Sequence, residues 1–202
     1  WLIELFSKTS TLSVFRNSLF FSEIQEKLKV INLYFKEGSD IWLNEFCDEM
    51  VGAIQDLYLP FGVVQREFPF YHANLIGGST KIFVFDWEFG RTNYPPLFDL
   101  FHCMMSDKQI SRAESVPFPE RVTNTLFVSK QAHMFVKKYV EELSIPPKAV
   151  YPLFVLFLID QLACYLPYVN ELEEVEGYRD ALQKLKNKSI FSFEKWKSTV
   201  SI

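Results

Sequence analysis

The sequence lacks the features that mark several classes of protein. Its 21 Lys and Arg residues are fewer than its 25 Asp and Glu residues and are scattered along the chain, so no basic stretch indicates a nucleic-acid-binding surface. The 3 cysteines lie far apart in apolar contexts, which favours buried thiols in a reducing compartment over a disulfide framework. No signal peptide pattern opens the chain. We therefore expect a cytoplasmic protein with no nucleic-acid partner.

Long apolar runs are also scarce. Residues 149–169 approach the length of about 20 residues that a membrane-spanning helix needs. Pro152, Asp160, Gln161 and Pro167 interrupt this run, and a charged residue in its middle would be costly in a bilayer. The pattern predicts a buried helix of a soluble core and no membrane partner.

Aromatic residues are abundant. The 21 Phe, 9 Tyr and 4 Trp residues make up 17% of the chain, a bulk that is typical of a well-filled core. The length of 202 residues suits one domain or one lobe of a larger protein, and we find no repeat or linker that would divide it. Because the first residue is Trp1, we expect a processed product or a piece of a longer protein.

Helical spacing of apolar residues covers most of the chain. Ser22 and Gln25 form a capping-box pattern ahead of a helix that ends by Gly38, and a second helix begins near Ser39 and stops before Pro60, so residues 1–60 are expected to be mainly helical. Helical periodicity returns over residues 97–105, 130–143, 150–166, 178–185 and 193–200.

The pattern changes at residues 61–90. Gly62-Val63-Val64 indicates a short strand, and the apolar pieces 75–76 and 82–85 flank a Gly77-Gly78-Ser79 turn. Asp86 follows the last of these strands, where a carboxylate can point into a cleft. The sequence therefore predicts an α+β class that is predominantly helical, with a small β insert.

Residues in this insert have the chemistry of a phosphotransfer site. Glu67 is a carboxylate in a loop, His72 and Asn74 offer an imidazole and an amide, and Asp86 is a second carboxylate after a strand. Such groups deprotonate a hydroxyl and hold Mg²⁺ against phosphate oxygens. Glycosidases and metal hydrolases use similar residues, so residue types alone leave those classes open.

The order of these residues resembles the aminoglycoside phosphotransferase and choline kinase family, whose catalytic loop reads H-G-D-x-x-x-x-N and is followed by a strand and D-W-E. Asp86-Trp87-Glu88 and Asp99-Leu100 match that family's pattern. The resemblance implies the C-terminal lobe of a protein-kinase-like phosphotransferase that uses Mg²⁺ and ATP. It implies that Asp86 binds the metal and Asp99 supports the loop. The substrate would be a hydroxyl of a small molecule such as a sugar, an aminoglycoside or an amino alcohol.

The catalytic loop departs from the family pattern and allows two registers. If Asn74 is the family's asparagine, Pro69 takes the place of the acid, which implies an inactive binding or scaffold module. If Gln65-Arg66-Glu67 replaces H-G-D, Glu67 is the general base and His72 takes the metal-binding asparagine position. We prefer the second register because Phe70-Tyr71 then falls where relatives have Pro-Trp. Two plainer interpretations stay open, in which Glu67 only pairs with Arg66 and His72 is a core histidine.

A kinase-like enzyme also needs a nucleotide-binding lobe with a phosphate-covering loop and a lysine. Residues before the catalytic segment have helical patterns, and Gly77-Gly78 comes after the catalytic loop, where it does not form a phosphate cradle. We therefore expect residues 1–202 to form a single C-terminal lobe, with the nucleotide lobe upstream of Trp1 or in another chain.

Overall fold

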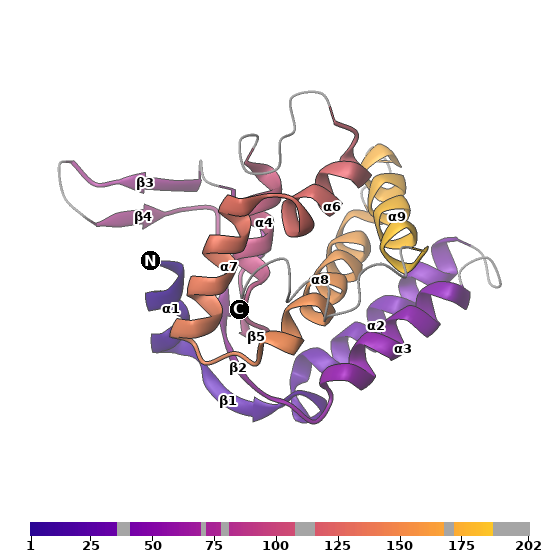
Figure 1. The fold of residues 1–202 in the computed structure, drawn as a ribbon, viewed down its shortest axis with the longest axis horizontal. Helices are drawn as coiled ribbons and strands as arrows, with labels where there is room; N and C mark the ends of the chain where they lie inside the picture. The colour runs from indigo at the N-terminus through magenta and orange to yellow at the C-terminus, as the bar shows by residue number, and fades with distance from the viewer. Residues whose placement is uncertain (36–40, 70–71, 78–80, 108–115, 168–171, 188–202) are drawn as a thin grey trace.

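The computed structural model describes residues 1–35, 41–69, 72–77, 81–107, 116–167 and 172–187. The described chain is mostly helical and has two small antiparallel sheets, which confirms the α+β class. Helix α8 (Val150–Tyr165) runs through the middle of the molecule, with α2 (Leu19–Tyr34) and α3 (Ile41–Ile54) on one side (Figure 1). Helices α4 (Phe98–Ser106) and α9 (Leu172–Asn187) also contact α8. Helix α6 (Phe118–Phe127) packs against α9 and α7 (Lys130–Glu142).

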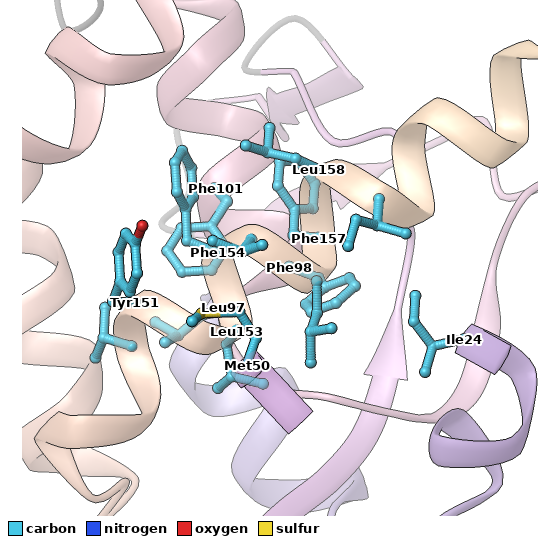
Figure 2. Packing of buried hydrophobic residues seen from close by; sticks show 14 of the residues in the cluster. Ile24, Met50, Leu97, Phe98, Phe101, Tyr151, Leu153, Phe154, Phe157 and Leu158 are labelled. Atoms are coloured by element: carbon cyan, nitrogen blue, oxygen red, sulfur yellow. The ribbon is translucent and has the colours of Figure 1, made fainter. Parts of the chain in front are cut away.

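The hydrophobic core is built around α8 and is rich in aromatic rings. Thirteen consecutive residues of this helix, Val150 to Leu162, are buried because neighbouring helices cover it on every side. Phe154 and Phe157 meet Phe98 and Phe101 of α4 in edge-to-face or tilted ring pairs. Figure 2 shows these rings beside apolar side chains from α2 and α3. The expected use of the aromatic residues in the core is therefore confirmed.

The same helix is the one candidate for a membrane span in the described part of the chain. Together with the preceding turn η4 (Pro147–Ala149) it is long and apolar enough to cross a bilayer, but most of it is buried inside the protein. That burial is typical of a core helix, as the sequence predicted. Its one ionised residue, Asp160, is fully buried and paired with cations.

Two antiparallel sheets carry the β structure. The first has the order β1-β2-β5, made of Thr11–Val14, Tyr58–Val64 and Arg91–Tyr94. The second is the hairpin of β3 (Ala73–Leu75) and β4 (Ile82–Val84), which projects from the body of the molecule (Figure 1). The predicted strands at residues 75–76 and 82–85 are thus confirmed within one or two residues, whereas the strand predicted at residues 62–64 begins four residues earlier, at Tyr58.

Several expectations need correction. Helix α2 begins a turn earlier than the pattern indicated: the Oγ of Ser18, and not that of Ser22, accepts a hydrogen bond at the helix start, from the N–H of Phe21. Buried Phe20 explains the longer helix, since it packs against Tyr94 and Phe98. Strand β1 interrupts the region expected to be helical. Helices α1 (Leu2–Thr9) and α6 lie in regions expected to be helical but were not predicted as separate helices, and strand β5 was not expected. The helix expected at residues 193–200 lies outside the described residues.

Candidate functional site

The loop that follows β2 is anchored by the buried carboxylate of Asp99. Asp99, in the first turn of α4, accepts hydrogen bonds from the backbone N–H of Gln65 at 2.9 Å and of Arg66 at 2.8 Å. Burial raises the pKa of Asp99 to about 6, although the two amides act in the opposite direction. Asp99 therefore fixes the backbone of the two residues that precede Glu67.

A second carboxylate holds the same loop through a side chain. Arg66 adopts the left-handed conformation, with φ of 71°, and its guanidinium donates to Oδ2 of Asp160 at 2.8 Å. The other oxygen of Asp160 accepts from Lys27 of α2 and from the hydroxyl of Tyr94, the latter at 2.7 Å. Burial alone would raise the pKa of Asp160, but the Lys27 and Arg66 cations outweigh it and lower this pKa. Asp160 stays ionised and ties α8, α2, β5 and the loop together.

The loop residue Glu67 faces a cavity of about 410 Å³. The cavity is lined by the loop residues Arg66 and Glu67, by Glu88 and Phe89 from the segment after β4, and by Gln161, Cys164 and Tyr165 from the last turns of α8. We call this cavity the acceptor pocket, after the role that we propose for it below. Two carboxylates and two aromatic rings line it, while the charge of Arg66 is matched by Asp160. Such a lining suits a ligand that carries an ammonium group.

His72 and Asp86 lie beside each other at the base of the β3–β4 hairpin. The imidazole Nδ1 of His72 donates to the carbonyl of Glu67 at 3.0 Å, and Nε2 lies 3.6 Å from Oδ2 of Asp86. A backbone partner for Nδ1 is the usual arrangement in metal-binding histidines, because it leaves Nε2 as the ligand atom. His72 is buried, which agrees with its interpretation as a core histidine. Its Nε2 atom nevertheless points toward the carboxylate of Asp86.

Gln65 connects these two parts of the site. Its backbone N–H is held by Asp99, and its side-chain amide donates to the carbonyl of Asp86, whose φ of 64° is unusual for a residue with a side chain. The bond fixes the strained turn that presents the Asp86 carboxylate. Glu67, His72 and Asp86 are thus brought to one region by contacts that include Gln65.

Asn74 takes a different place. It lies on β3, paired with Phe83 of β4, and its side chain is exposed. Among the described residues no group of three or more His, Cys, Asp or Glu side chains is arranged to hold a metal ion. The pair of His72 and Asp86 offers two ligands at most. Mg²⁺ is commonly held by one or two carboxylates with waters and substrate phosphates, so one carboxylate fits such a site in part.

Sequence reasoning missed the residues that hold the loop from the side. The sequence did not indicate that four residues border the site: Asp160, Lys27, Tyr94 and Cys164. The position of Asp160 in the middle of an apolar run was a usable signal, because a buried carboxylate needs partners. Nothing in the local pattern around Lys27 indicates its long-range pairing.

Comparison of the chain with family models, with curated proteins and with solved structures gives no significant match.

Proposed function

We propose that this chain is the helical lobe of a kinase-like phosphotransferase that transfers the γ-phosphate of ATP to a hydroxyl of a small molecule. The observation that carries the proposal is the pair of hydrogen bonds from the Gln65 and Arg66 amides to Asp99, which fix the backbone before Glu67 at the wall of the acceptor pocket. This arrangement supports the register in which Glu67 is the general base, since phosphotransfer depends on a well-positioned group near the acceptor hydroxyl.

Asp86 and His72 are the residues that would hold the metal in this proposal. Their side chains lie 3.6 Å apart, and the carboxylate supplies the oxygen ligand that Mg²⁺ prefers. Bound Mg²⁺ would neutralise charge on the phosphates of ATP. In the same proposal Glu67 would accept the proton of the acceptor hydroxyl, and Asp99 would keep Glu67 in place through the backbone.

The lining of the acceptor pocket favours one part of the acceptor range. Glu67 and Glu88 with the rings of Phe89 and Tyr165 suit an amino alcohol or another hydroxylated amine better than a neutral sugar. The proposal retains a cytoplasmic location, which the unpaired and buried thiols of Cys47 and Cys103 support.

A second candidate is a kinase-like binding module without catalysis. The lack of a third metal ligand among the described residues favours it. Either candidate would bind ATP only together with a nucleotide lobe. The tests below therefore use the full-length protein.

Nucleotide binding is tested by thermal unfolding with and without Mg²⁺ and ATP. We expect a rise in Tm for the wild type, its loss in Asp86→Asn, and its retention in Asp56→Asn, which removes an exposed carboxylate paired with Arg16. No rise in the wild type would refute nucleotide binding. Binding without transfer to any amino alcohol would favour the inactive module.

A further inference from the structure

A second cavity lies next to the acceptor pocket. It measures about 320 Å³ and is lined by Glu23, Lys27 and Val30 of α2, by Arg91 of β5, by Ala163 and Cys164 of α8, and by Arg66. Arg66 and Cys164 line both cavities. These two side chains therefore form a wall between the cavities, which we call the Arg66–Cys164 wall.

The wall is held at several points. The guanidinium of Arg66 donates to Sγ of Cys164 and to Asp160, which lies one helical turn before Cys164 on α8. The same guanidinium lies 5.2 Å from the centre of the Tyr94 ring. With its backbone N–H bound to Asp99, Arg66 is fixed at both ends. A side chain with so many buried contacts does not move aside for a ligand without breaking an ion pair.

The backbone at this position would suit glycine better than arginine. A φ of 71° is accessible to glycine without steric cost, whereas an L side chain is disfavoured there. The arginine is nevertheless 93% buried, so its side chain serves a purpose beyond the turn. Closing the pocket is the purpose that its contacts indicate.

We propose that Arg66 is a specificity-determining residue that ends the acceptor pocket at Cys164 and restricts the acceptor to small hydroxylated amines. A cavity of about 410 Å³ is near the lower end of the range for ligand sites, and removal of the wall would join it to the second cavity. The joined space would admit longer acceptors, and because Lys27 and Arg91 line its far end, the added length should be neutral and carry no further amino groups. The acceptor part of this inference rests on the proposed function, but the wall itself can be tested without any activity.

The wall is tested by the rate at which iodoacetamide alkylates each cysteine, followed by mass spectrometry. In Arg66→Gly we expect the Cys164 thiolate to react at least about tenfold faster than in the wild type, after correction for the higher thiol pKa that loss of the Arg66 cation causes, because the half-buried sulfur loses part of its cover. Cys47 and Cys103 are buried elsewhere in the protein and should react at unchanged rates. Arg16→Gly, at an exposed arginine, should leave all three rates unchanged.

A second variant guards against loss of the fold. Arg66→Lys keeps a cation for Asp160 but removes the planar group that covers Cys164, so an intermediate rate is expected. An unchanged rate at Cys164 in Arg66→Gly would overturn the inference. So would a joint rise at all three cysteines in both variants, because Arg66 would then support the fold as a whole.

The specificity role is tested on the full-length protein with Mg²⁺ and ATP. We compare kcat/KM for an ethanolamine that carries a long neutral substituent on its nitrogen with kcat/KM for ethanolamine itself, and expect Arg66→Gly to raise this ratio at least about tenfold. If alkylation of Cys164 is faster but the ratio of kcat/KM values is unchanged, Arg66 does separate the two cavities. Its role in acceptor specificity would then be wrong. If the wild type phosphorylates neither compound, the proposed function and the specificity role both fail, while the alkylation rates still decide whether the wall exists.

Discussion

Replacement of Asp160 by Asn should be among the most destabilising isosteric changes in this protein. The side chain is fully buried, and its two oxygens accept from Lys27, Tyr94 and Arg66. An amide keeps one acceptor oxygen but turns an N–H₂ group toward Arg66, which is itself a donor. Lys27 can still pair with Glu23, which lies 3.7 Å away, and with water. The cost therefore comes mainly from Arg66, a buried cation left without a carboxylate partner, and should be about 3 to 5 kcal/mol.

Urea unfolding measures this cost. The matched control is Asp56→Asn, since Asp56 also pairs with an arginine but both side chains are more than half exposed. Its cost should stay below about 1 kcal/mol. The double variant Asp160→Asn with Arg66→Gln should be more stable than the sum of the single effects predicts, with a coupling of about 1 to 3 kcal/mol. If Asp160→Asn costs no more than Asp56→Asn, the assignment of Asp160 as the buried counter-ion of Arg66 is wrong.

Three further predictions concern Asp99, the start of α2 and the aromatic core. Burial raises the pKa of Asp99 from 3.8 to about 6, so its contribution to stability is fully present below the lower value and is lost as the pH rises through the higher one. The stability of the wild type relative to Asp99→Asn, from urea unfolding at several pH values, should therefore fall by about 3 kcal/mol between about pH 4 and pH 7; a flat difference would contradict the raised pKa. Ser18→Ala should cost about 1 kcal/mol in the same assay and Ser22→Ala much less, because only Ser18 caps α2; equal costs would argue for the other cap. Phe157→Ala should cost about 3 to 5 kcal/mol because its ring is fully buried between α4 and α8, and a smaller loss would mean that the core closes the cavity.

The helices were predictable where apolar spacing was strong. The predicted helix at residues 150–166 differs from α8 by one residue, and the helix at 130–143 has the same start as α7. The start of α2 was wrong because Ser22 offers a cap motif, whereas burial of Phe20 in the core decides where the helix begins. Tertiary packing there outweighs a local signal worth about 1 kcal/mol.

Strand β1 and strand β5 were missed for a different reason. Each has only 4 residues and pairs with β2, which lies far away in the sequence, so their strand conformation depends on long-range hydrogen bonds. Helix α1 has 8 residues, about two turns, and contacts β2 as well. Local propensity is a weak predictor of elements as short as 4 to 8 residues.

The candidate site was predictable in its residue types and only partly in its connections. Glu67, His72 and Asp86 were named from order and spacing, and His72 and Asp86 do lie side by side. The pairing of Arg66 with Asp160 joins residues 94 positions apart, and no periodicity reports such a contact. The catalytic role of Glu67 remains a prediction.

The most direct test of the proposed function is phosphate transfer by the full-length protein. The assay follows the γ-phosphate of ATP to an amino alcohol in the presence of Mg²⁺, for the wild type and for Glu67→Gln. The account predicts transfer by the wild type, and a loss of at least about a hundredfold in the variant with nucleotide binding retained, because general-base catalysis typically contributes that much or more. Undiminished transfer by Glu67→Gln would contradict it.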